Sequence, residues 1–184
     1  MAKVYEFLAN GFEEIEGLAP VDILRRGGVE VITVSVTGEI WVETSHGITV
    51  MADMLFEDAD LSDADMLLLP GGMPGSKNLA QHAELMEILQ DHWSRGGTVA
   101  AICAAPGLVV SQLSGLAGRK VTCFDGFEEA LIGQGAIYTP EGTVTDGNLI
   151  TGRGAGWAVD FGLAILAHLK GFEAAAKVRA GLML

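Results

Sequence analysis

Cysteine is scarce in this chain, with two residues, Cys103 and Cys123, among 184. Two cysteines can form at most one disulfide, and a chain of this length with no export signal does not need one. We therefore interpret both as free thiols. Basic residues are also few, with 11 lysines and arginines against 24 aspartates and glutamates. The net charge of −13 repels nucleic-acid phosphates and anionic lipid headgroups, which argues against either as a direct partner.

Long apolar runs are missing as well. Although 49% of the residues are hydrophobic, glycine, proline or charge interrupts every run before the ~18 residues that a membrane span needs. The first six residues carry one lysine and run directly into a strand-like segment, without the apolar region of a signal peptide. We therefore expect no membrane span and a cytoplasmic location.

Signals for metals and nucleotides are weak. The four histidines, His46, His82, His92 and His168, lie outside the loops discussed below, the first in a hairpin turn and the others on predicted helix surfaces. No His/Cys/Asp group has the spacing of metal ligands, so we predict no metal. The glycine-rich segment 71–75 lacks the Lys-Ser/Thr of a phosphate loop, and no G-x-G-x-x-G follows the first strand. We therefore expect no cofactor.

The chain does contain a regular alternation of short apolar runs and helix-like segments. Strands are predicted at residues 4–9, 29–36, 65–69, 98–102, 121–124 and 148–151, and a hairpin at 40–42 and 48–51. Helices are predicted at residues 13–26, 76–95, 105–113, 157–169 and 173–180. This pattern, without a linker or repeat, predicts one α/β domain over residues 1–184 with a mostly parallel sheet covered on both faces.

Ligands bind such sheets beyond the carboxyl ends of the strands, where three loops should meet: residues 10–16, 70–75 and 102–106. Cys103 lies there at a strand-to-helix turn among small residues that permit a nucleophile elbow. The helix that follows would lower the thiol pKa, and the backbone N–H groups of Gly72 and Ala104 would receive an oxyanion. Alternatively, Cys103 is a buried apolar residue, which is the commoner fate of a free cysteine.

The segment Ala-Ala-Ile-Cys-Ala-Ala-Pro at residues 100–106 resembles the nucleophile motif of the DJ-1 branch of the DJ-1/PfpI superfamily. The similarity extends to Glu13-Glu14-Ile15-Glu16 before Pro20-Val21-Asp22, to Leu69-Pro70-Gly71-Gly72 and to Gly152-Arg153-Gly154-Ala155-Gly156. These motifs stand in the family's order and cover nearly the whole chain. The resemblance favours a functional Cys103 over a structural one.

The resemblance implies a flavodoxin-like three-layer sandwich, a homodimer, and a carboxylic acid that hydrogen-bonds the cysteine sulfur. By position this acid is Glu16. A carboxyl group pressed against a thiolate in a partly buried site should have a raised pKa, remain protonated as a donor and exchange protons during turnover. The alternative is an ordinary first-turn glutamate favoured by the helix dipole, which suits Glu13 and Glu14 better.

Departures from the family narrow the expected activity. A His follows the nucleophile in PfpI-type proteases, but Ala104 stands here, so we do not expect proteolysis. Phe124 stands where animal DJ-1 proteins have a His, and Ala155 replaces the proline of the usual Gly-Pro-Gly. We expect Gly71, Phe124 and Arg153 at the pocket, with Arg153 either bracing its turn or supplying positive charge near Cys103. Cys123 is expected in the core.

The resemblance implies a cofactor-independent enzyme of glyoxalase or deglycase type, which acts on reactive dicarbonyls such as methylglyoxal or on their adducts with thiols and amines. Cys103 would add to the aldehyde, Glu16 would move protons, and hydrolysis would release a hydroxy acid. The alternative is a redox-responsive stress protein or chaperone whose Cys103 oxidises to sulfinic acid. The sequence does not separate these two functions.

Overall fold

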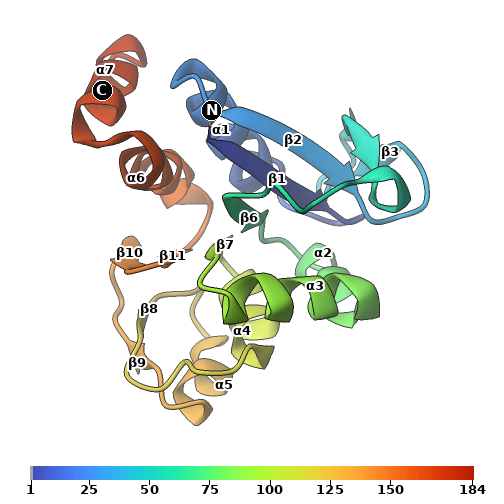
Figure 1. Ribbon diagram of the computed structural model, residues 1–184, viewed down its shortest axis with the longest axis vertical. Coiled ribbons are helices and arrows are strands. Elements are labelled where there is room, and N and C mark those ends of the chain that lie inside the picture. Colours follow the sequence, from blue (N-terminus) through green and yellow to red (C-terminus); the bar gives the residue numbers. More distant parts are fainter. Residues whose placement is uncertain (1) are drawn as a thin grey trace.

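Seven strands form the central sheet of the computed structural model, which describes residues 2–184 (Figure 1). The strand order is β10-β11-β7-β6-β1-β2-β5. The bounds are β1 Lys3–Leu8, β2 Glu30–Ser35, β5 Met54–Leu55, β6 Met66–Leu69, β7 Thr98–Ile102, β10 Thr143–Asp146 and β11 Leu149–Gly152. Every neighbouring pair is parallel except β10 with β11. The predicted, mostly parallel sheet is confirmed.

Helices cover both faces of this sheet and enclose two apolar cores (Figure 1). One face carries α1 Glu14–Arg26, α6 Ala158–Lys170 and α7 Phe172–Gly181, and the other carries α2 Gly75–Gln81, α3 Ala83–Ser94, α4 Ala105–Leu108 and α5 Glu128–Gly133. Along β1, Val4 points into the core on the side of α1, α6 and α7, whereas Tyr5 and Phe7 point into the core on the side of α2 to α5. Both faces are covered, so strands β6 and β7 are buried along their whole length. The result is the predicted flavodoxin-like sandwich.

Two small sheets lie outside the central one. The predicted hairpin is present as β3 Trp41–Glu43 and β4 Thr49–Met51, and the Gly11 N–H donates to the Glu43 carbonyl at 2.7 Å. The strand predicted at 121–124 is a shorter β8 Lys120–Val121, which pairs with β9 Ile137–Tyr138 and does not join the central sheet. The strand thus ends before Phe124, which lies beside the elbow described below.

Two predicted helices are shorter than expected. The helix predicted at 76–95 is divided at His82, whose extended backbone and Nδ1, accepting from the Leu85 N–H at 3.2 Å, start α3 anew. The helix predicted at 105–113 ends at Leu108 and is followed by the 3₁₀ turn η2 Val110–Gln112. Within α4, a Cβ on Gly107 would collide with the Phe127 carbonyl.

One of the histidines predicted on a helix surface, His92, takes part in packing. His92 is buried, with Nε2 3.0 Å from the Thr98 carbonyl oxygen. His168 is exposed on α6, as predicted, with Nε2 3.4 Å from Thr98 Oγ1. The amphipathic pattern of α3 did not reveal the burial of His92, because a histidine with one polar partner tolerates burial. No helix within residues 2–184 is long and apolar enough to cross a membrane.

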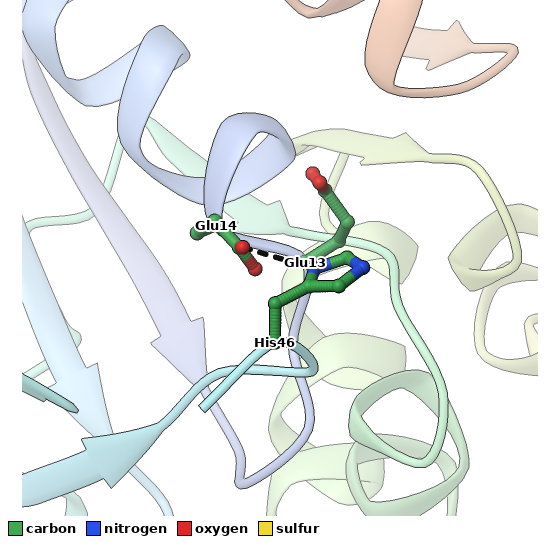
Figure 2. A group of neighbouring side chains, drawn as sticks. All are labelled: Glu13, Glu14 and His46. Carbon is green, nitrogen blue, oxygen red and sulfur yellow. Dashed lines mark ion pairs between the residues drawn. The ribbon is translucent and has the colours of Figure 1, made fainter. Parts of the chain in front are cut away.

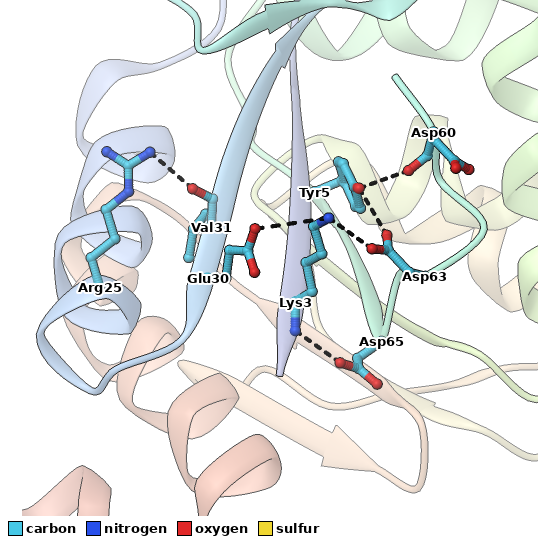
Figure 3. Close-up of polar contacts among 8 residues, drawn as sticks. All are labelled: Lys3, Tyr5, Arg25, Glu30, Val31, Asp60, Asp63 and Asp65. Atoms are coloured by element: carbon cyan, nitrogen blue, oxygen red, sulfur yellow. Dashed lines mark hydrogen bonds and ion pairs between the residues drawn. The ribbon is translucent and has the colours of Figure 1, made fainter. Parts of the chain in front are cut away.

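The amino-terminal end of β1 is tied to the segment before β6 by polar contacts (Figure 3). Lys3 Nζ lies 2.7 Å from Asp63 Oδ2, and the Tyr5 hydroxyl donates to the Asp60 carbonyl at 2.7 Å. The Lys3 backbone N–H also donates to Asp65 Oδ2 at 2.8 Å. These contacts fix the register of β1 at the end of the sheet opposite to the elbow, so the carboxyl end is left for the site.

Candidate active site

The three loops predicted to meet at the carboxyl edge of the sheet do so. The Glu13 N–H donates to the Gly71 carbonyl at 3.0 Å, and the Gly75 N–H donates to the Gly11 carbonyl at 3.1 Å. Gly71 in turn lies against Cys103, because a Cβ built on Gly71 would collide with both the Glu16 carboxyl and the Cys103 side chain. The loops therefore close around a single thiol–carboxyl pair.

Cys103 forms the elbow between β7 and α4. Its φ of 65° is in the left-handed region, where a non-glycine residue carries strain of order 1–3 kcal/mol. The surrounding backbone holds it there: the Cys103 N–H donates to the Gly152 carbonyl at 2.9 Å, and the Cys103 carbonyl accepts from the Phe124 N–H at 2.8 Å. The side chain is half-buried rather than enclosed. This arrangement presents the sulfur at the sheet edge.

Glu16 lies in the first turn of α1 with 1% of its surface exposed. Burial raises the pKa of this carboxyl to about 7, against a hydrogen bond with Cys103 that lowers it, and the charge of Glu13 raises it further. The N–H groups of Ala155 and Gly71 lower the pKa more weakly. Oε2 is enclosed and lacks a well-aligned hydrogen bond within residues 2–184, which favours the protonated form.

The pKa of Cys103 differs from the sequence-based prediction. Burial raises this pKa to about 12, and the negative charge of Glu16 adds to the increase, whereas hydrogen bonds from the Gly72 and Ala104 N–H groups oppose it. The predicted lowering by a helix dipole was wrong because α4 has four residues and a single turn sums few peptide dipoles. Between about pH 7 and 12 the pair therefore holds one proton.

The predicted pocket residues occupy different positions. An open pocket of about 410 Å³ is lined by Phe124, Asp125, Arg153, Gly154, Ala155, Gly156 and Trp157. Gly71 lies between Glu16 and Cys103. Arg153 Nη2 lies 2.7 Å from Asp125 Oδ1, and Nη1 donates to the Pro140 carbonyl at 2.9 Å. Of the two roles left open for Arg153, these contacts favour bracing. Cys123 is fully buried in the core, as expected.

The sequence placed His46 outside the site loops, but the structure brings it to them (Figure 2). His46 Nδ1 lies 2.9 Å from Glu14 Oε1, and the hydrogen bond with Glu14 raises the pKa of His46. Glu13 caps α1, with Oε2 accepting from the Glu16 N–H at 2.8 Å. The three side chains offer ligand atoms within 4.8 Å of one another. The ion pair accounts for the His46–Glu14 contact, and it links the hairpin to α1.

Trp157 and Asp125 were missed at the sequence level. The sequence pattern predicts a helix that begins at Trp157, but in the structure Trp157 belongs to the 3₁₀ turn η3 Ala155–Trp157. A large aromatic residue directly after a glycine-rich turn was the signal in the sequence that could have indicated a pocket residue. Asp125 carried none, because its partner Arg153 is 28 positions away.

Comparison with known proteins agrees with this geometry. The model of the DJ-1/PfpI family matches residues 2–168. The chain belongs to the DJ-1/PfpI family. Within the family it is 38% identical to the Parkinson disease protein 7 homolog of Danio rerio over 180 residues, which are 96% of this chain and 94% of that protein.

Other DJ-1 relatives share both sequence and fold. The glutathione-independent glyoxalase DJR-1.2 of Caenorhabditis elegans is 31% identical over 161 residues, with 88% of this chain and 84% of that protein covered. The structure of oxidized Toxoplasma gondii DJ-1 superposes with a TM-score of 0.93 at 31% identity, covering 100% of this chain and 98% of that one. Membership of the DJ-1 family is thus supported over the whole described chain.

Proposed function

We propose that this protein is a cofactor-independent enzyme that converts small α-oxoaldehydes, or their early adducts with thiols and amines, into hydroxy acids. The observation that carries this proposal is the Glu16–Cys103 pair, a strained nucleophile in contact with a carboxyl group whose pKa is raised to about 7. A group with such a pKa gives and takes protons near neutral pH. The glyoxalase name of one relative supports the same chemistry.

The first step forms a carbon–sulfur bond. The Cys103 proton passes to Glu16, and the sulfur adds to the aldehyde carbon while the carbonyl π pair moves to oxygen. The protonated Glu16 then gives this proton to the alkoxide, which yields a hemithioacetal. Before that transfer, the N–H groups of Gly72 and Ala104, which lower the pKa of the thiol, would stabilise the negative oxygen.

The second step is an internal redox exchange that needs no external oxidant. The Glu16 carboxylate takes the proton from the former aldehyde carbon, which gives an enediolate. The hydroxyl proton passes from the first oxygen to the second, and Glu16 returns its proton to the neighbouring carbon. The first carbon is thereby oxidised to a thioester and the second reduced to an alcohol. Water then cleaves the thioester, which releases the hydroxy acid and restores the thiol. For an adduct substrate, the amine or thiol leaves as Cys103 takes its place.

Turnover of methylglyoxal by the purified protein tests the proposal. Lactate should form without glutathione or added metal, and Cys103→Ser should abolish it because a serine hydroxyl is a far weaker nucleophile than a thiolate. Cys123→Ser is the matched control, since Cys123 is buried in the core away from the pair. Lactate formation at the unmutated rate in Cys103→Ser would refute the mechanism.

The second candidate is a redox-responsive protein whose Cys103 oxidises to sulfinic acid. The donors around the sulfur, the Gly72 and Ala104 N–H groups and a protonated Glu16, would also hold sulfinate oxygens. Oxidation-dependent suppression of client aggregation, without dicarbonyl turnover, would favour this function over the enzyme.

A further inference from the structure

Two large aromatic side chains stand half-exposed on the pocket beside the thiol–carboxyl pair. The exposed fractions are 50% for Phe124 and 46% for Trp157. Both line the pocket of about 410 Å³, a volume in the range that small ligands occupy. Exposed rings that converge on one pocket offer apolar area for a ligand to cover.

Phe124 is joined directly to the catalytic elbow. Its backbone N–H donates to the Cys103 carbonyl at 2.8 Å. Its ring lies 3.3 Å from the position of a Cβ built on Gly154, and Glu16 Oε1 lies 3.9 Å from the same position. The position that a side chain at Gly154 would occupy is thus within 4 Å of both the phenyl ring and the Glu16 carboxyl. Since Glu16 also contacts the Cys103 side chain, the phenyl ring lies beside the catalytic pair.

Trp157 is held by the turn that closes the pocket. Its backbone N–H donates to the Gly154 carbonyl at 2.8 Å, and its indole lies directly against Gly142, where a Cβ would collide with the ring. Glycine at 142 therefore decides where the indole lies. The position of this part of the pocket wall therefore depends on Gly142, which is not part of the catalytic pair.

The charge of the pocket disfavours anions. Arg153 is the cation in its lining, and its guanidinium is engaged with Asp125 and the Pro140 carbonyl. Glu13 and Glu16 add acidic groups at the neighbouring loop. A substrate carboxylate or phosphate placed here would meet negative charge and no free cation among the lining residues.

We propose that Phe124 and Trp157 form an aromatic subsite that binds a flat, uncharged substituent of the substrate, so that aryl α-oxoaldehydes such as phenylglyoxal are preferred over methylglyoxal and over carboxylate-bearing carbonyls. The inference rests on the proposed function for its substrate class. Contact of one ring with another changes binding by about twofold to tenfold, so the two rings together should give a preference of tenfold or more.

The kinetic test compares kcat/KM for phenylglyoxal and methylglyoxal. The unmutated protein should favour phenylglyoxal by about tenfold, and Phe124→Leu and Trp157→Leu should each lower this ratio about threefold to tenfold. Gly142→Ala should lower it as well, because the new methyl group displaces the indole. Phe172→Leu, at an α7 residue that is 87% exposed, is the matched control and should leave the ratio unchanged. Equal ratios in all five proteins would overturn the subsite.

A second measurement separates failure of the subsite from failure of the proposed function. The measurement is the rate of Cys103 alkylation by N-phenyl iodoacetamide divided by the rate of its alkylation by iodoacetamide. The same ratio is measured for free cysteine as the reference. The ratio should exceed that of free cysteine about tenfold and fall in the same three variants, with or without turnover. An aryl preference in alkylation without turnover would reject the enzyme and keep the subsite, whereas turnover without any aryl preference would reject the subsite alone.

Discussion

Glu16 and Cys103 share a proton at a place where Gly71, which has no side chain, packs directly against both of them. Burial, together with the charge of the Glu16 carboxylate, raises the thiol pKa to about 12, and burial raises the Glu16 pKa to about 7. The thiolate therefore exists at neutral pH mainly when Glu16 has taken the proton. Reactivity belongs to the pair rather than to the cysteine.

Replacing Glu16 by Gln should separate its two roles. The amide retains a donor of similar shape but cannot exchange a proton, so dicarbonyl turnover should fall by ~10²–10⁴-fold, as for a lost general acid/base. Removal of the carboxylate charge should at the same time lower the pKa of Cys103 below about 12. Thiolate absorbance and alkylation rate against pH measure the second effect. Full turnover by Glu16→Gln would show that the glutamate is structural.

The activity should depend on pH through the pair. Below about pH 7 both groups are protonated, and loss of one proton produces the reactive form. kcat/KM should therefore rise tenfold per pH unit up to about 7 and then level off. Glu13→Gln should move this transition to lower pH, because the charge of Glu13 raises the Glu16 pKa. A pH profile of methylglyoxal turnover that is flat between pH 5 and 8 would contradict the assignment.

Glu6 should make the fold less stable as pH rises. This carboxyl is fully buried on β1, both of its oxygens lack partners within residues 2–184, and burial raises its pKa well above 4.5, against a smaller opposing effect of Arg25. Because the folded pKa is the higher one, its stabilising contribution is complete below the unfolded pKa and is lost as pH rises toward the folded pKa.

Glu6→Leu should remove this dependence. Between pH 5 and 7.5 the unmutated protein should lose free energy of unfolding relative to the variant, at up to ~1.4 kcal/mol per pH unit. Urea denaturation at several pH values is the measurement. Glu30→Leu is a useful control, because Glu30 starts the neighbouring strand β2 but is exposed. Parallel stability profiles for the unmutated protein and Glu6→Leu would disprove the assignment.

The homodimer expected from the sequence has a candidate surface. Large apolar side chains are exposed on α1 and on the β3–β4 hairpin: Ile15, Leu18, Trp41, Ile48 and Met51. The ion pair between His46 and Glu14 joins these two elements. We predict that sedimentation at micromolar concentration shows a dimer, that Ile48→Asp shifts it to monomer, and that Phe172→Asp on α7 does not. A monomeric unmutated protein would exclude the dimer.

The sheet and the elbow could be predicted because their signals are local. Strands β6 and β7 are continuous apolar runs, and Cys103 follows β7 directly among small residues. The helix break at His82 could not be predicted, because its cap is formed by a side chain that also fits a helix surface. The approach of His46 to Glu14 depends on how the hairpin folds back over 32 positions. Its sequence carried no sign of this contact.

The direction of the Cys103 pKa was missed for a different reason. The predicted lowering assumed a full helix after the elbow, and the sequence pattern up to Leu113 allowed one. The close packing of Gly107 against Phe127 and the two β-branched residues that follow end α4 after four residues. Burial then decides the pKa, and burial is a property of the assembled loops.

At Cys103 the backbone conformation that presents the nucleophile also lowers the stability of the fold. A φ of 65° at Cys103 suits glycine, which adopts it without steric strain. Cys103→Gly would therefore relax the backbone and, where the lost side-chain packing is small, give a more stable protein with no nucleophile. A lineage selected for stability alone would drift toward glycine here, so retention of a side chain at this dihedral marks a residue that is kept for what its sulfur does.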